Sequence, residues 1–178
     1  EYQVEALART HAWAERSLVE VKRLRAARPD KPYQALFGVL QGANYEDLRK
    51  QTAEFLGAMD FDGYGIGGAL EKETMAQTIQ WVNQILPENK PRHLLGISEP
   101  DDIFAAIEQG IDTFDCVSPT RVARNGAAYT PFGRVNVRGQ KYREMFAPIM
   151  DDCDCYTCKN YTAAYLCHLL HARESLAG

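Results

Sequence analysis

The chain has 178 residues, of which 46% are hydrophobic and 25% are charged. This composition excludes a disordered tail or linker, because a chain of this length and apolar content buries a hydrophobic core. The formal net charge of -4 gives no overall attraction for polyanions. Any contact with nucleic acid therefore has to come from a local cluster of basic residues.

The sequence also bears on the cellular compartment. No stretch approaches the roughly 18 consecutive apolar residues of a membrane-spanning helix, and residues 1–10 do not resemble a signal peptide. The five cysteines are an odd number, and three of them lie within six residues, which favours metal binding over a disulfide framework. We expect a soluble, cytoplasmic protein. Because the chain begins without Met inside a helical pattern, we also expect it to be part of a longer protein.

Hydrophobic periodicity predicts alternating helices and strands over the first two thirds of the chain. Apolar residues at spacings of three and four predict helices over residues 4–24, 48–59, 75–85 and 103–109. Short apolar runs that end at turn residues predict strands over residues 35–42, 61–68, 92–97 and 112–117. The fourth helix is expected to start within residues 98–102, with Pro100 in its first turn.

The expected strands end near residues 41, 66, 96 and 115, with one helix between each pair. This order is typical of successive βα units, so it predicts an α/β fold with a parallel sheet. An open doubly wound sheet and part of a (β/α)8 barrel both have this order. Four units fill about half of the roughly 250 residues of a full barrel. Periodicity alone leaves the two alternatives open.

The last third of the chain has a different pattern. Residues 127–139 predict a β-hairpin that turns between Pro131 and Gly133, and an amphipathic helix follows through Tyr161 and Leu169. We therefore expect two domains, with about four βα units over residues 1–126 and an appended subdomain over residues 127–178.

Cys153, Cys155 and Cys158 are the strongest chemical signal in the sequence. Three thiolates at this spacing can bind one soft cation, and they favour zinc. Three exposed free thiols are a poor alternative, because such thiols oxidise easily. A closed structural site needs a fourth ligand. His168 and His171 are the candidates within the chain, although ordinary helical positions explain them better.

Several polar or small residues lie where the expected strands end. In a parallel sheet these ends meet at one edge, where α/β enzymes build their sites. The residues are Gln41, Gly67, Gly68, Leu95 and Asp115. We expect the Asp115 carboxylate to be held at a pocket as nucleophile, base or metal ligand, the alternative being a helix N-cap or a loop salt bridge. A glycine pair more often marks a turn than a close approach to a ligand.

A cluster of cations follows Asp115. Six basic residues lie within the 23 residues 121–143, namely Arg121, Arg124, Arg134, Arg138, Lys141 and Arg143. They form either a phosphate-binding edge or a solvated charged face. The sequence has no P-loop, HExxH or GxSxG motif, which excludes the corresponding nucleotide-binding, zincin and α/β-hydrolase sites.

Five segments, taken in chain order, resemble the tRNA-guanine transglycosylases, the queuine tRNA-ribosyltransferase family. They are FGVLQG (37–42), FDGYGIGG (61–68), KPRHLLGI (90–97), GIDTFDCVSPTRVARNG (110–126) and CDCYTCKNYTAAYLCHL (153–169). The resemblance implies the C-terminal half of a (β/α)8 TIM barrel with an appended zinc-binding subdomain. It also implies the family's activity, in which guanine at the wobble position of certain tRNA anticodons is replaced by a 7-deazaguanine, preQ1 or queuine.

The resemblance assigns roles to the residues at the strand ends. Asp115 matches the family's nucleophile, which attacks C1′ of the ribose and forms a covalent intermediate with the tRNA. Gln41 and the backbone of Gly67 and Gly68 match positions that read the base. Leu95 matches an apolar position that packs on the face of the base. The exchange of one N-glycosidic bond for another needs no energy-supplying cofactor.

The resemblance also assigns roles beyond Asp115. Arg121 and Arg124 match residues that contact the anticodon loop, where RNA is recognised as an unstacked single strand. Cys153, Cys155 and Cys158 match three of the four zinc ligands, and the fourth, a His, would fall beyond Gly178. The family pattern further implies a homodimer formed largely through the zinc subdomain.

The chain departs from the family pattern in two further respects. It lacks the N-terminal half, which supplies four strands and two other functional Asp residues, so we expect this chain alone to be inactive. The loop over residues 67–75 is also shorter than the corresponding loop in most of the family. The Glu that supports base recognition is therefore Glu71, Glu73 or neither of them. The alternatives are a non-catalytic zinc-containing partner subunit, against which the intact Asp115 argues, and a zinc-stabilised interaction module with no RNA role.

Overall fold

The computed structural model describes residues 1–68, 70–97 and 99–178, so Ser98, at the expected start of the fourth helix, lies outside the described residues. The chain divides into two compact units, Glu1–Cys116 and Val117–Gly178. The N-terminal unit consists of α1 (Tyr2–Ala27), β1 (Phe37–Leu40), α2 (Glu46–Gly57), β2 (Gly63–Ile66), α3 (Met75–Asn83), β3 (Arg92–Leu95), α4 (Pro100–Glu108) and β4 (Thr113–Asp115).

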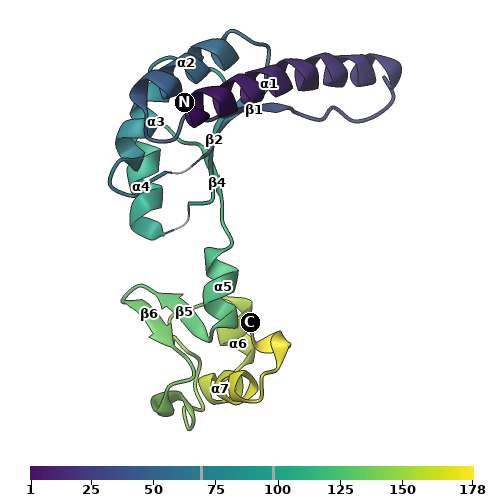
Figure 1. Cartoon of the computed structure of the whole chain (residues 1–178). Helices are drawn as coiled ribbons and strands as arrows, with labels where there is room; N and C mark the ends of the chain where they lie inside the picture. Colours follow the sequence, from purple (N-terminus) through teal and green to yellow (C-terminus); the bar gives the residue numbers. More distant parts are fainter. Residues whose placement is uncertain (69, 98) are drawn as a thin grey trace. The chain divides into compact units, whose positions relative to one another are not determined.

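The four strands of this unit form one sheet in the order β1-β2-β3-β4. Every neighbouring pair is parallel, which confirms the α/β order and the parallel sheet predicted from the sequence. Helices α2, α3 and α4 lie side by side along one face of the sheet (Figure 1). Helix α1 packs against α2 and β1.

The face of the sheet toward these helices is apolar because the strands are in register. Leu40 pairs with Ile66, Ile66 with Leu94, and Leu94 with Phe114. The first three of these side chains are completely buried, which provides most of the driving force for docking the helices. Helix residues complete the same cluster, among them Leu56, Ile79 and Ala106.

The opposite face of the sheet carries the alternate residues of each strand, because successive side chains point to opposite faces. Val39 pairs with Gly65, Gly65 with His93, and His93 with Thr113. Val39 and Thr113 are exposed in the described chain, and His93 is partly exposed. We call this the open face. Any ligand of the strand-end residues has to approach from this side.

Asp62 ties the end of α1 to the start of the sheet. Its Oδ2 accepts hydrogen bonds from Arg25 Nη2 at 2.9 Å and from the Leu36 backbone N–H at 2.7 Å, and its Oδ1 accepts one from the Tyr33 hydroxyl. Desolvation opposes ionisation, but these donors prevail and lower the pKa of Asp62 to about 2. The guanidinium of Arg25 also lies 4.1 Å from the ring centre of Tyr33.

The C-terminal unit is smaller and less regular. It consists of α5 (Ser118–Arg124), β5 (Ala127–Thr130), β6 (Gly133–Asn136), the 3-10 helix η1 (Gln140–Tyr142), α6 (Tyr156–Asn160), α7 (Ala163–His171) and the 3-10 helix η2 (Ser175–Ala177). Strands β5 and β6 form the predicted hairpin, and α7 is the predicted final helix. Helix α5 belongs to this unit because it packs against β5 and η2.

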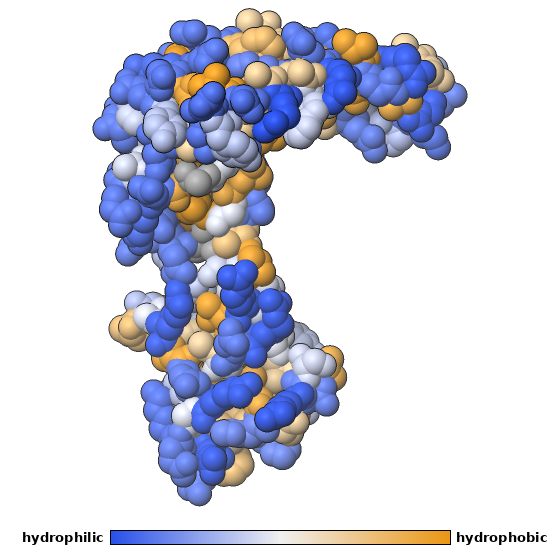
Figure 2. Space-filling view, in the orientation of Figure 1, coloured by the Kyte–Doolittle hydropathy of each residue, from blue (hydrophilic) through white to orange (hydrophobic). Residues whose placement is uncertain are grey.

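The surface of both units is largely hydrophilic on the side drawn in Figure 2, with scattered apolar residues. Within the described residues, no helix is both long and apolar enough to span a bilayer. Helix α1 is 26 residues long, but it is amphipathic, because Leu7 and Leu18 are buried and charged residues lie on its other side. The helix therefore packs on the unit by one narrow apolar stripe.

Candidate active site and metal centre

The strand-end residues expected to form a site lie on the open face. Leu95 pairs with Asp115 across β3 and β4. Gly67 directly follows β2, and a Cβ placed on it would lie 2.8 Å from Leu95 Cδ1 and 3.6 Å from Gln41 Nε2. The next residues on the open face, toward the carboxyl ends of the strands, are thus Gln41, Gly67, Leu95 and Asp115. We call these four residues the strand-end row.

Gly68 has a conformation that requires glycine. Its φ of +90° lies in the left-handed region, and a Cβ would lie 2.7 Å from Gln41 Oε1. The absence of a side chain at Gly67 and Gly68 lets the Gln41 amide and Leu95 approach the backbone closely. The glycine pair therefore makes room within the row, in addition to any role as a turn.

Arg49 contacts the strand-end row from helix α2. The sequence analysis did not identify this residue. This fully buried side chain on α2 donates hydrogen bonds to the backbone oxygens of Ala43 at 2.6 Å and Gly67 at 2.8 Å. Burial lowers the pKa of Arg49 to about 10. Its Nη2 is buried without a hydrogen-bond partner among the described residues, close to Gly68. The guanidinium fixes the carbonyl of Gly67 and places a positive charge under the row.

Asp115 differs in one respect from the expectation of a pocket. Its side chain is 62% exposed, so it is accessible from solvent and not enclosed. Two donors nevertheless fix it, since Oδ1 lies 3.0 Å from His93 Nε2 and 3.3 Å from the Gly96 backbone N–H. A carboxylate that is both held and accessible can attack an electrophilic carbon, accept a proton or bind a cation.

The two arginines that follow Asp115 lie on α5 in the C-terminal unit. Arg121 and Arg124 are both exposed and three residues apart, so they extend from neighbouring positions on the helix surface. Two of the other cations contact aromatic rings. The guanidinium of Arg134 lies 5.2 Å from the ring centre of Tyr129, and Lys141 Nζ lies 4.7 Å from that of Tyr142.

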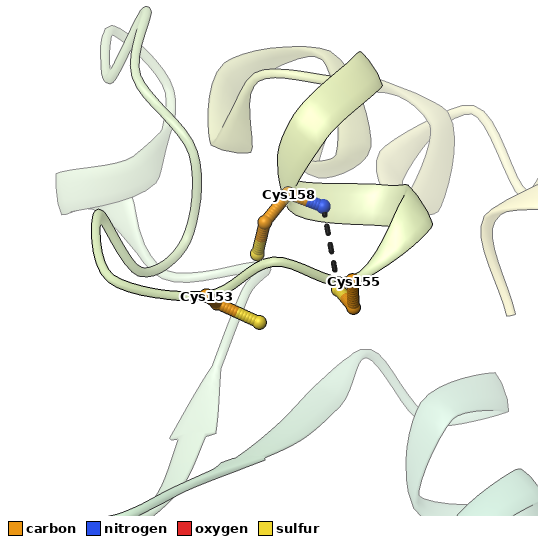
Figure 3. A group of neighbouring side chains, drawn as sticks. All are labelled: Cys153, Cys155 and Cys158. Carbon is orange, nitrogen blue, oxygen red and sulfur yellow. Dashed lines mark hydrogen bonds between the residues drawn. The ribbon is translucent and has the colours of Figure 1, made fainter.

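The three clustered cysteines converge as their spacing predicts. Their sulfur atoms all lie within 4.8 Å of one another (Figure 3). Cys155 precedes the first residue of α6, and its Sγ accepts a hydrogen bond from the Cys158 backbone N–H at 3.5 Å. This N–H lowers the pKa of Cys155, whereas burial raises the pKa of Cys158. Sulfur atoms of a tetrahedral zinc site are about 3.8 Å apart, so this group fits such an ion.

The histidines considered as a fourth ligand are not part of this group. Among the described residues, the cluster contains the three thiols and no histidine. His168 and His171 are exposed on α7, and His171 Nε2 lies 3.1 Å from the backbone oxygen of Arg138. Cys167 is buried in the core of the unit with Tyr142, as expected for a small apolar residue.

The two glutamates considered for base recognition follow β2. Glu71 and Glu73 are both exposed, and Ala69 of the same loop lies outside the described residues.

His93 is a residue next to the row that the sequence analysis did not name. It stands in the middle of a strand, and its position two residues before Leu95 places it on the same face as the row.

Comparison with known proteins gives a consistent result. The profile of a family described as queuine tRNA-ribosyltransferase matches residues 1–178. The chain is 48% identical over 179 aligned residues to a queuine tRNA-ribosyltransferase of Streptococcus pneumoniae (strain Hungary19A-6). It is 46% identical over 178 residues to the protein of that name from Pediococcus pentosaceus. In each comparison the match covers 98% of this chain and 45% of the relative.

Proposed function

Because the chain belongs to the queuine tRNA-ribosyltransferase family, we propose that the complete protein exchanges guanine at the wobble position of tRNA anticodons for a 7-deazaguanine such as preQ1 or queuine. The observation that carries this proposal is the accessible, doubly hydrogen-bonded carboxylate of Asp115 at the end of the strand-end row. The 178 residues span 45% of the relatives' length, and we propose that alone they are inactive.

Asp115 acts as the nucleophile. A lone pair of its carboxylate forms a bond to C1′ while the C1′–N9 bond breaks, and guanine leaves with that electron pair and takes up a proton. The incoming base then loses its N9 proton and attacks C1′ from the vacated side, which breaks the ester and restores the carboxylate. Two inversions give net retention, as in retaining glycosidases.

The remaining residues of the row recognise the base. Gln41 offers both an amide donor and an amide acceptor. The Gly67 N–H already donates to the Leu40 backbone oxygen, so the backbone groups available to a base are those of Gly68, next to the row, and the second lone pair of the Gly67 carbonyl, whose first accepts from Arg49. Leu95, with 38% of its surface exposed, supplies an apolar contact for a flat heterocycle. The tRNA nucleoside has to leave its stack to reach Asp115, which fits recognition of an unpaired anticodon loop.

Arg121 and Arg124 bind the anticodon loop. Both side chains are exposed on α5, and neither forms a salt bridge with another described residue, so they can contact phosphates or bases without breaking an internal ion pair. Replacing either by Ala should weaken tRNA binding and reduce its salt dependence, because each phosphate contact releases condensed counterions.

The three thiols hold a structural zinc ion. Cys153, Cys155 and Cys158 would bind it as thiolates, and a histidine beyond Gly178 would complete the coordination. The ion would link the turn before α6 to the helix and contribute no chemistry to base exchange. We further propose that the four βα units form half of a (β/α)8 barrel in a cytoplasmic protein, and that two copies associate through the zinc subdomain.

The test is to trap the covalent intermediate in the complete protein. Labelled tRNA is mixed with enzyme without added base and run on a denaturing gel that separates free from protein-linked RNA. We expect a protein-linked band that Asp115→Asn abolishes. Asp101→Asn, which changes an exposed carboxylate in the first turn of α4, should keep the band. An unchanged band with Asp115→Asn would refute the proposed nucleophile, and a protein that binds tRNA without exchange would be a non-catalytic subunit.

A further inference from the structure

His93 lies between two polar residues of β4. It pairs with Thr113 across the two strands, and all three side chains belong to the open face. His93 Nδ1 lies 2.8 Å from Thr113 Oγ1, and Nε2 lies 3.0 Å from Asp115 Oδ1. The imidazole ring therefore contacts two residues of the neighbouring strand, Thr113 and Asp115, which are successive on the same face of the sheet.

This arrangement determines the tautomer of the ring. An ionised carboxylate only accepts hydrogen bonds, so the proton of a neutral His93 has to lie on Nε2, which faces Asp115. Nδ1 is then an acceptor, and Thr113, whose hydroxyl can donate, supplies its proton. The chain of bonds runs in one direction, from the Thr113 hydroxyl to the imidazole and from the imidazole to Asp115.

Both donors to Asp115 reach the same oxygen atom. The Gly96 backbone N–H lies 3.3 Å from Oδ1, and it also donates to the Asp115 backbone oxygen at 3.0 Å. Gly96 has a φ of +77°, which a side chain would disfavour. In the part of the chain that the structure describes, no hydrogen bond reaches Oδ2. The two oxygens of the carboxylate are thus unequal.

We propose that His93 is a positioning residue that, together with the Gly96 N–H, holds Oδ1 so that Oδ2 is the oxygen that attacks the sugar, with Thr113 donating to Nδ1 and so holding the imidazole ring in place. The proposal rests on the proposed function of Asp115. When Oδ2 bonds to C1′, Oδ1 becomes the carbonyl oxygen of the ester and keeps both hydrogen bonds. When the ester breaks, the electron pair returns to Oδ2 and the carboxylate is ready again.

Stability alone gives little reason for this arrangement. Asp115 is mostly exposed and His93 retains a quarter of its exposure, and a pair this accessible to solvent contributes little to folding. Substitutions of His93 should therefore leave the fold intact. What they change is the direction of the carboxylate, and misplacing a reacting group by about 1 Å can cost about 100-fold in rate.

The test uses two amides that each replace one ring nitrogen. The Gln side chain can place its NH2 near the position of Nε2 and so still donate to Oδ1, whereas the shorter Asn reaches only toward Thr113. In single-turnover formation of the covalent intermediate by the complete protein, we expect His93→Asn to be slower by about 10- to 100-fold. His93→Gln should recover most of that loss. Thr113→Val should give a smaller decrease, because Nδ1 then loses its donor and the ring is held less firmly, while Nε2 still donates to Asp115.

A purely structural role would give a different result. We expect the dissociation constant for tRNA to change less than about twofold in all three variants, because none of these residues contacts the phosphate backbone in this proposal. Equal losses in His93→Asn and His93→Gln, or a normal rate in His93→Asn, would overturn the proposal. Should His93→Asn fail to fold, the rates of His93→Gln and Thr113→Val decide. A nearly normal rate in His93→Gln with a modest loss in Thr113→Val supports the proposal, and a large loss in His93→Gln overturns it. An intermediate that survives Asp115→Asn would refute the proposed function, independently of His93.

Discussion

The two units hold their candidate sites by different means. In the N-terminal unit the site residues lie on or just after the strands of a sheet whose other face is a continuous apolar core. In the C-terminal unit the thiols lie in a turn and a five-residue helix, and the buried cluster nearby is small, comprising Tyr142, Ala163 and Cys167. We therefore expect the first site to form when the chain folds, whereas the second would depend on a bound ion for much of its order.

Metal removal should separate the two units most clearly. We expect Cys158→Ser, or a strong chelator, to abolish zinc binding and to loosen residues 117–178 while residues 1–116 stay folded. Structural zinc contributes about 10–16 kcal/mol in small zinc-binding peptides, so this is the largest effect. Metal analysis and peptide-resolved hydrogen exchange measure it. Cys116→Ser, in the other unit, should keep the metal. Full zinc occupancy in Cys158→Ser would refute the three-thiol site.

Arg49 tests how far the strand-end row depends on the core. Arg49→Met removes a buried charge but leaves the carbonyls of Ala43 and Gly67 without their donor, so we expect a loss of about 2–4 kcal/mol in the free energy of unfolding. Lys50→Met is the matched control, because Lys50 only pairs with Glu46 near the surface. Its effect should stay within about 1 kcal/mol. Urea denaturation compares the two, and equal losses would contradict a special role for Arg49.

Two glycine substitutions compare the row with a helix of the same unit. Gly68→Ala should destabilise the unit by about 1–3 kcal/mol, because its φ is positive and the new Cβ would meet Gln41, and it should also weaken binding of free guanine. Gly57→Ala on α2 meets its nearest neighbour at 3.5 Å and should leave stability unchanged or raise it by up to about 1 kcal/mol. Unfolding midpoints and calorimetric titration with guanine report both.

The last comparison concerns acid sensitivity, which tests the link between α1 and the sheet. The pKa of Asp62 is lowered from 3.8 to about 2, so the folded state binds this proton less tightly than the unfolded state. Its contribution is complete above the unfolded pKa and is lost as pH falls through the folded pKa. We expect Asp62→Asn to be less stable than the natural chain at neutral pH, with the difference shrinking from about pH 4 toward pH 2. A difference that grows on acidification would refute this assignment.

The sequence predicted the sheet and most of the row for identifiable reasons. Short apolar runs between turn residues marked the strands, and parallel order put Gln41, Gly67, Leu95 and Asp115 at one edge. Arg49 was missed because a charged residue on a helix suggests a surface position. Its spacing of three, four and seven residues from Thr52, Ala53 and Leu56, all buried, was the available signal.

Two other features could not be predicted from local patterns. Helix α5 was not predicted from the sequence, although proline is favoured in the first turn of a helix and Pro119 occupies that place here. His93 was missed because its partners lie about 20 residues away on another strand. Only the register between β3 and β4 brings them together.

The shortness of β4 has a consequence for errors in assembly. Both Thr113 and Asp115 belong to this three-residue strand, which lies at the edge of the sheet formed by the described residues and pairs there with β3. A slip of one residue along β3 would turn both side chains inward to the helices and expose Phe114 instead. Such a molecule would retain its helices and its metal cluster yet have no reactive group to offer. Turnover of the complete protein, measured against its secondary-structure content, would therefore report the fraction of chains with correctly aligned strands.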